Sequence, residues 1–189
     1  PADKLLNKLA KRSDVLALAL HVDYWDYIGW ADNFARPEHT QRQKAYAHLA
    51  GSRTIYTPQM VVNGVEQIVG ARPMEVADAV MDHLAQGPTV DLTLAQSGET
   101  LHISAPIPEE VRGVMLVQLV RFIPDKTVEI RKGENAGKTL DYSNIVTSWD
   151  VIEEWSGAAP LAMDVSIMGE ESAAVVVQQR GDGSVLAAS

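Results

Sequence analysis

The sequence predicts an α/β domain over residues 1–87, followed by an all-β, sandwich-like domain over residues 88–189. Two observations predict this division. Up to residue 87, segments with helical spacing alternate with apolar strand-like runs, whereas from Thr89 onward apolar residues recur at every second position between closely spaced turns. Gln86-Gly87-Pro88 separates the two patterns, so we place the domain boundary there.

The first three elements are expected to be a helix, a buried strand and a second helix. Residues 2–12 carry leucines at helical spacing. Residues 15–22 are apolar without alternation, which is typical of a parallel strand buried on both faces. After a long aromatic and acidic loop, residues 38–50 have the character of a helix that ends at Gly51.

A hairpin and a third helix are expected to complete the first domain. Asn63-Gly64 stands between the apolar runs 59–62 and 65–69, and an Asn-Gly pair in that setting is a strong hairpin signal. Residues 70–84 follow as a helix. The resulting order of elements is that of a thioredoxin-like domain without its first strand. In a thioredoxin-like domain that strand lies inside the sheet, so its absence would leave a gap in the core. The chain also begins with Pro1 rather than Met, so we expect the missing strand in a longer form of the protein.

The second domain is expected to hold six to eight short strands over about one hundred residues, which favours a β-sandwich. Apolar residues alternate around 90–94, 101–103, 114–116 and 128–130. Glycine and proline mark turns at residues 97–98, 106–108, 124–125, 133–137, 157–160 and 181–183.

Composition excludes several classes of function. Lys and Arg total 16 against 25 Asp and Glu, a net charge of −9, which argues against nucleic-acid or anionic-membrane partners. The longest apolar run, residues 15–20, is too short to span a bilayer. The chain has no cysteine, so it carries no thiol chemistry of its own, and we expect no cofactor.

The densest cluster of functional side chains is residues 21–30, which leave the carboxyl end of the predicted strand, where α/β sheets bind ligands. It includes His21, Asp23, Trp25 and Asp26. A structural interpretation is equally open, with aromatic rings covering the sheet edge and carboxylates bonding backbone N–H groups. Imidazole and carboxylates also suit zinc or manganese. Because His21 and Asp23 alternate along a strand-like path, we predict no metal site.

A second candidate is Thr57-Pro58, directly before the first hairpin strand. Thioredoxin-like proteins place a cis-proline at this point, facing their redox pair, so the order of elements favours a cis bond. An ordinary trans proline that ends a loop is the alternative. Two other patterns are turns: residues 133–139 have too few residues for a phosphate loop, and Arg180-Gly181-Asp182 is a hairpin loop.

Several stretches resemble one known family, the exported bacterial proteins called domain of unknown function twelve twenty-three (DUF1223). The similarity covers essentially the whole chain, and the stretches that carry it are Pro1-Ala2-Asp3, residues 21–26, Gly29-Trp30, residues 56–59, residues 62–64, residues 133–137 and residues 144–146. Members have a thioredoxin-like domain followed by a β-rich domain, and typically carry Cys-x-x-Cys-Pro immediately before the segment that matches Pro1-Ala2-Asp3. A cysteine there would have its thiolate stabilised by the helix dipole.

The resemblance implies a periplasmic or secreted protein whose longer form handles thiol–disulfide exchange with a thiol- or disulfide-bearing protein or small molecule. His21, Asp23 and Asp26 would tune the thiolate pKa or relay protons. The residues expected to hold the substrate are Trp25, Tyr56, Thr57, Pro58 and Gln59. The alternatives are a binding module without enzymatic activity and, more remotely, a metal-dependent hydrolase built on the same three ionisable residues.

Overall fold

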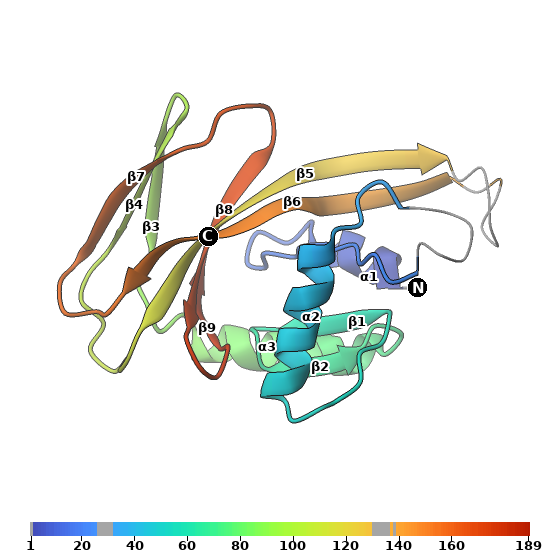
Figure 1. Ribbon diagram of the computed structural model, residues 1–189, viewed down its shortest axis with the longest axis horizontal. Helices are drawn as coiled ribbons and strands as arrows, with labels where there is room; N and C mark the ends of the chain where they lie inside the picture. Colours follow the sequence, from blue (N-terminus) through green and yellow to red (C-terminus); the bar gives the residue numbers. More distant parts are fainter. Residues whose placement is uncertain (1, 26–31, 130–136, 138) are drawn as a thin grey trace.

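The computed structural model describes residues 2–25, 32–129, 137 and 139–189, which form three helices and nine strands (Figure 1). The strands make three antiparallel sheets. No helix in these ranges is long and apolar enough to cross a membrane.

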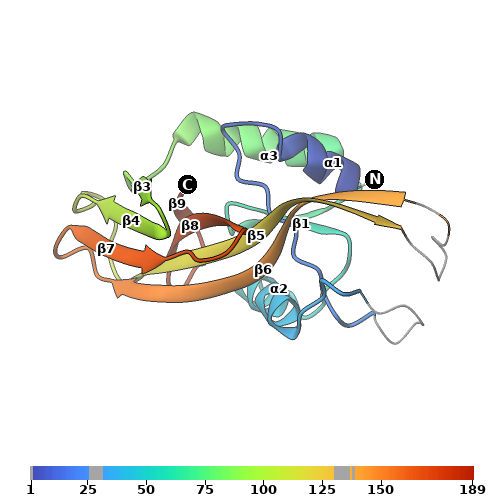
Figure 2. The ribbon, with the colours of Figure 1, turned by 90° about the horizontal axis from the view of Figure 1, so that it is seen from above.

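The first half of the chain follows the predicted order except at the buried strand. α2 lies on one side of this half, and α1 and α3 lie on the other (Figures 1 and 2). The predicted helices and hairpin are confirmed, with α1 ending three residues earlier than expected. The elements are α1 (Ala2–Leu9), α2 (Pro37–Leu49), β1 (Gln59–Val62), β2 (Glu66–Val69) and α3 (Pro73–Gln86).

The β1–β2 hairpin turns at Asn63-Gly64, whose φ angles of 48° and 79° lie in the left-handed region, and Val65 N donates to Val62 O across this turn at 3.1 Å. α3 packs on both strands. From the other side, the Gln43 amide of α2 donates to Gln59 Oε1 of β1 at 2.9 Å. The two-stranded sheet is therefore held between two helices.

The second half contains seven strands in two antiparallel sheets, of order β3-β4-β7 and β6-β5-β8-β9. One hydrophobic core joins the sheets: Ile103 of β4 and Leu161 of β7 pack in the same cluster as Met115 and Val117 of β5 and Val175 of β8. The strands are β3 (Thr93–Ser97), β4 (Thr100–Ala105), β5 (Met115–Glu129), β6 (Thr139–Trp155), β7 (Leu161–Ser166), β8 (Ser172–Gln179) and β9 (Val185–Ala188).

Two of these strands are much longer than predicted. β5 runs through Pro124-Asp125, where a turn was expected, and it pairs with β6 along its whole length. A proline is tolerated there because β8 pairs with β5 only as far as Phe122, so beyond that point β5 has one neighbour. The turn predicted at 133–137 and the sequence resembling a phosphate loop fall largely outside the described residues. The hairpin loop at Arg180-Gly181-Asp182 is confirmed between β8 and β9.

The buried parallel strand predicted at residues 15–22 is wrong in its extent and its burial, since only Ala17 is fully buried. The segment is extended, but it makes a single parallel bridge, between Ala19 and Ile145 of β6. Its three leucines, at positions 16, 18 and 20, pack on a second core cluster formed by β5, β6 and β8. The segment therefore joins the sheet of the second half and not the β1–β2 sheet.

The hairpin turn of the first half docks on the β8–β9 loop of the second half. Val185 N donates to Asn63 O at 2.8 Å, and Gly64 is buried against Gly183. A Cβ atom at Gly64 would overlap the Gly183 carbonyl oxygen. Glycine is thus required at this position both for its positive φ and for the close approach of two backbones.

We expect Gly64→Ala to destabilise the protein by about 2–4 kcal/mol, because the new methyl group forces the two turns apart. Gly98→Ala is the matched control: Gly98 also has a positive φ, of 60°, but no atom lies within 4 Å of its Cβ position. Backbone strain alone should then cost about 1 kcal/mol. Urea unfolding measures both changes, and equal losses would contradict the docking of the two turns.

Candidate functional site

The start of α1 and the Thr57-Pro58 turn meet at Gly70. A Cβ atom placed on Gly70 would lie 3.1 Å from Pro58 Cβ and 3.2 Å from Ala2 Cβ, and Gly70 N donates to Pro58 O at 2.9 Å. The Thr57–Pro58 peptide bond is cis, as predicted. Because Thr57 and Pro58 are both exposed, the first turn of α1 opens beside an accessible stretch of chain.

Trp25 lies against this turn. The sequence analysis had placed Trp25 and residues 56–59 in one substrate-binding site, which requires them to be neighbours. Its indole Nε1 donates to Thr57 Oγ1 at 2.9 Å, and its ring is tilted against Tyr24 at 5.7 Å between centroids. Trp25 nevertheless stays 48% exposed. The indole is therefore an oriented apolar surface beside the turn.

Tyr56 and Gln59, the other two predicted substrate-binding residues, are fastened to α2. The Gln43 amide donates to Tyr56 O at 2.7 Å and to Gln59 Oε1 at 2.9 Å, and Gln43 Oε1 accepts from Tyr24 OH at 3.0 Å. Gln59 in turn donates to Gln67 Oε1 at 3.0 Å. The Tyr56 carbonyl and the Gln59 side chain therefore help to hold the turn against α2. The sequence analysis did not single out Gln43.

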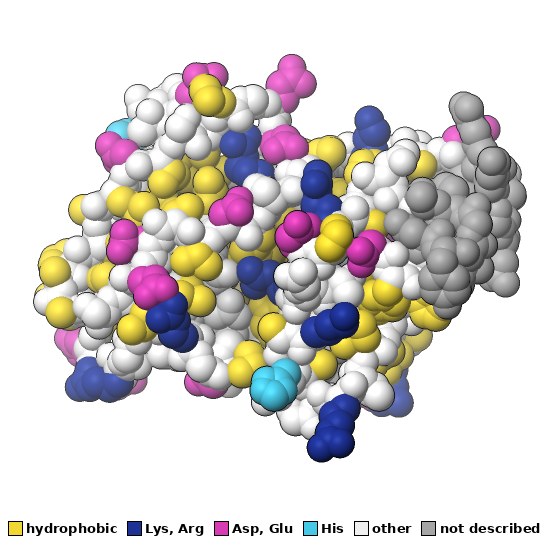
Figure 3. Space-filling model, viewed as in Figure 1, with side chains coloured by type: hydrophobic (Ala, Val, Ile, Leu, Met, Phe, Trp, Pro, Cys, Tyr) yellow, Lys and Arg dark blue, Asp and Glu magenta, His cyan; other side chains and the backbone are white. Residues whose placement is uncertain are grey.

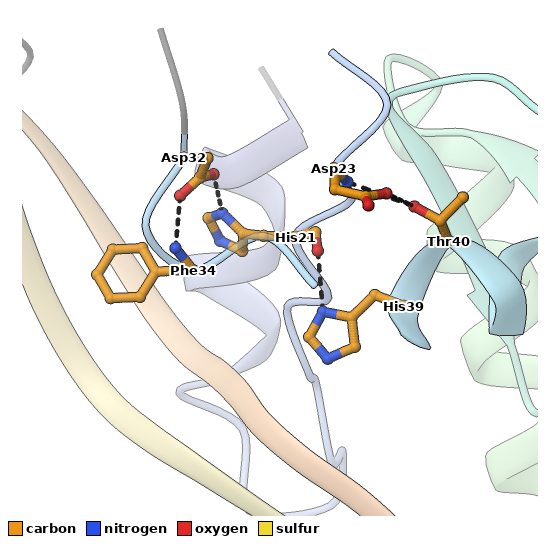
Figure 4. A network of polar contacts seen from close by, with 6 residues as sticks. All are labelled: His21, Asp23, Asp32, Phe34, His39 and Thr40. Atoms are coloured by element: carbon orange, nitrogen blue, oxygen red, sulfur yellow. Dashed lines mark hydrogen bonds and ion pairs between the residues drawn. The ribbon is translucent and has the colours of Figure 1, made fainter. Parts of the chain in front are cut away.

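The His21 ring contacts the Asp32 carboxylate and the Phe34 ring, both drawn in Figure 4, and also the ring of Tyr142. Its Nδ1 lies 2.5 Å from Asp32 Oδ2, and Phe34 N donates to Asp32 Oδ1 at 2.9 Å. Phe34 and Tyr142 contact the imidazole edge-on, with centroids at 5.6 Å and 5.0 Å. The carboxylate that pairs with His21 is thus Asp32, which the sequence analysis did not identify because it lies eleven residues further along the chain.

The pKa values around His21 follow from burial and neighbouring charge. Burial opposes ionisation of Asp32, but the hydrogen bonds from His21 and the Phe34 N–H outweigh it and hold the pKa of that carboxyl below its ordinary value. Burial, with the charges of Asp3 and Asp32 adding to it, raises the pKa of Tyr142 to about 12. Asp3 belongs to the first turn of α1, so this polar cluster borders the start of that helix.

Asp23 points away from His21, toward α2 (Figure 4). Its carboxylate accepts from Thr40 Oγ1 at 2.5 Å, while the His39 ring donates from Nδ1 to the His21 carbonyl at 2.9 Å. Burial lowers the pKa of His39. Asp26 lies outside the described residues. Within the described ranges no three His, Cys, Asp or Glu side chains are placed to hold a metal ion.

Asp32→Asn should make the free energy of unfolding depend less on pH under acidic conditions. The pKa of Asp32 is lowered by folding, so its contribution is present above the unfolded-state value and is lost as pH falls through the folded-state value. The unfolding free energies of wild type and variant should therefore differ at about pH 5 and converge toward about pH 2.

Urea unfolding across this range measures the convergence. Asp78→Asn is the control, because Asp78 is exposed on α3 and the described residues give it no hydrogen bond or ion pair. A difference for Asp32→Asn that is the same at every pH would contradict the assigned role of its charge.

Comparison with known proteins places this chain in one family. A crystal structure of a protein from Agrobacterium tumefaciens is 28% identical to this chain with a TM-score of 0.85, and the match covers 100% of this chain and 85% of that one. Its name states no activity. No protein with a curated description matches. The model of the family described as protein of unknown function (DUF1223) matches residues 1–179, so the chain belongs to that family, as its sequence motifs predict.

Proposed function

We propose that the first half of the chain is the body of a thioredoxin-like domain, that the second half is a β-sandwich-like domain, and that the protein is exported. We further propose that a longer form, with Cys-x-x-Cys directly before Pro1, exchanges thiols and disulfides. The observation that carries the proposal is the meeting of α1, at Ala2, with the Thr57-Pro58 turn across Gly70.

This arrangement suits a nucleophilic cysteine at the start of α1. The helix dipole stabilises a thiolate there, and the thiolate is the reactive form. The thiolate attacks one sulfur of a substrate disulfide, forming a mixed disulfide and releasing the other sulfur as a thiolate. The second cysteine then attacks the mixed disulfide, so the protein ends as a disulfide and the substrate as a dithiol.

The described side chains supply the surroundings of this reaction. Thr57 and Pro58 are exposed and hold a substrate backbone, while Trp25 covers its apolar side chains. His21, which is paired with Asp32, contacts the Tyr142 ring. The negative charge of Asp3, in the first turn of α1, raises the pKa of Tyr142, so the cluster lies within electrostatic reach of the start of that helix. His21 is thereby the residue best placed to relay protons, with Asp32 in the role that the sequence analysis gave to Asp23.

The direct test is to express the chain with its natural upstream segment and measure reduction of a fluorescent peptide disulfide, with excess dithiothreitol present to return the oxidised cysteine pair to the dithiol and a protein-free reaction subtracted. We expect turnover that is lost when the first upstream cysteine is replaced by serine. Thr57→Val should slow the peptide reaction about tenfold, because it removes the bond that orients Trp25. Alkylation of the same thiol by iodoacetamide should not change.

Thr93→Val is the matched control, since Thr93 is exposed on β3, in the other half of the chain. An upstream segment without a cysteine pair would overturn the proposal. So would an absence of turnover with both cysteines shown to be reduced.

A second candidate is a binding module without enzymatic activity, and the specific observation that favours it is Trp25. An indole 48% exposed and fixed by a hydrogen bond is a ready contact for a ligand or protein. In that case Trp25→Ala would weaken capture of the partner, and an upstream cysteine pair would be absent or dispensable.

A further inference from the structure

A cleft of about 650 Å³ lies between α2 and strands β5, β6 and β8, apart from the Thr57-Pro58 turn. This volume is in the range of small-molecule sites. α2 supplies one wall through Arg42, Tyr46 and Leu49, and the strands supply the other. Around α2, the face of the molecule in Figure 3 carries basic and acidic side chains close together, not a block of one sign.

Arg42 is fixed in this cleft by contacts that leave part of its guanidinium available. The guanidinium carbon lies 3.9 Å from the centroid of the Trp149 ring, a cation–π distance. Its Nη2 donates to Gln118 Oε1 at 3.0 Å. The Tyr46 hydroxyl also interacts with the guanidinium. Among the described residues, no Arg42 nitrogen is both fully buried and without a partner, and Arg42 lines the cleft, so a ligand in the cleft can reach the guanidinium.

Among the described residues, Arg42 forms no ion pair. The described residues place no carboxylate within ion-pair distance of it, and burial lowers its pKa. A half-buried cation without an anion is costly, so an anion entering the cleft gains from the pairing. By contrast, Arg180 at the same cleft is already paired with Glu154.

The neighbours of Arg42 are neutral amides that are already engaged. Gln118 Oε1 also accepts from Trp149 Nε1 at 2.9 Å, and its amide donates to Gln178 Oε1 at 3.0 Å. Gln178 donates to Gly183 O at 2.5 Å and to Tyr46 OH at 3.1 Å. Gln118 is 1% exposed and Gln178 is 6% exposed. This buried network holds Arg42 in position without neutralising it.

We infer that the cleft binds a small organic carboxylate with an apolar body, and that Arg42 holds its charged group. A guanidinium presents a planar fork that matches a carboxylate. Leu49, Leu116 and Val151 give the cleft apolar walls. Glu38 and Asp150 also line it, and their charges disfavour a multiply charged anion such as phosphate.

The test uses the 189-residue chain with three probes: benzoate, its uncharged analogue benzamide, and inorganic phosphate. Amide and side-chain NMR resonances follow each titration at low ionic strength. We expect benzoate, at about 1–10 mM, to shift the Trp149 Nε1–H and Arg42 Nε–H resonances in a saturable way. Benzamide and phosphate should each bind at least about tenfold more weakly.

Three variants assign the binding to Arg42. Arg42→Gln should abolish it, and Arg42→Lys should weaken it about tenfold because the charge remains but the fork is lost. Ser148→Trp fills the cleft wall and leaves Arg42 unchanged, so it should also abolish binding. Arg53→Gln, at an exposed arginine outside the cleft, is the matched control and should bind like wild type.

The unfolding midpoint of each variant shows whether it has folded, and Ser148→Trp keeps the test decisive if Arg42→Gln does not fold. Full binding by a folded Arg42→Gln or Ser148→Trp would overturn the inference. If benzamide bound as tightly as benzoate, the negative charge of the ligand would not matter and the inference would be wrong. If phosphate bound as tightly, the cleft would bind anions in general and the preference for a carboxylate would be wrong. No saturable shift with benzoate would also overturn it.

Discussion

The arrangement of the two halves depends on how residues 15–22 attach to β6. Ala19 N donates to Asn144 O and Val146 N donates to Ala19 O, both at 2.9 Å, and Asn144 Nδ2 donates to Ala17 O at 2.7 Å. The carbonyl of Asn144 and the N–H of Val146 thus face the edge of β6 that lies away from β5. The 15–22 segment therefore adds a short parallel partner to that edge of the sheet.

Asn144 is suited to this position by its backbone conformation. Its φ is 51°, in the left-handed region, which asparagine tolerates better than most residues. The sharp local turn of the backbone lets both its carbonyl and its side chain face the incoming segment. His21 and Asp23 follow directly, so this attachment also decides where the polar cluster lies relative to α1, whose Asn7 bonds the Asp141 carbonyl at 2.8 Å.

Much of the fold could be predicted from local chemistry, and the rest depends on partners remote in sequence. The Asn63-Gly64 turn and the three helices are predicted by patterns of residues that are close in sequence, and the structure has them at those positions. The strand at 15–22 was assigned from apolar composition alone, which shows that a segment is buried but not what it pairs with. β5 was divided at Pro124 because a proline signals a turn unless its strand has an open side, and that is a tertiary fact.

For the candidate site too, local sequence patterns predicted some neighbours and missed those that are remote in sequence. The sequence analysis grouped Thr57, Pro58 and Trp25 from the order of elements and the aromatic loop, and in the structure Trp25 bonds Thr57 next to Pro58. Gln59, by contrast, had the composition of a ligand-binding residue but is engaged by Gln43, and no local pattern reveals which amides pair with each other. Asp32 was missed for the same reason.

α2 is the element that connects the two sites. Its Thr40 and Gln43 face the His21 loop and the hairpin, while Arg42 and Tyr46 face the cleft. A helix in water is stabilised by one apolar stripe, yet the buried residues of α2 are mostly polar: His39, Thr40, Gln43 and Ala47. Buried polar side chains need specific hydrogen-bond partners. His39 and Thr40 find theirs in the 21–24 segment, and Gln43 finds its partners on either side of the Thr57-Pro58 turn. The composition of this helix is therefore better explained by the two surfaces that it positions than by core packing.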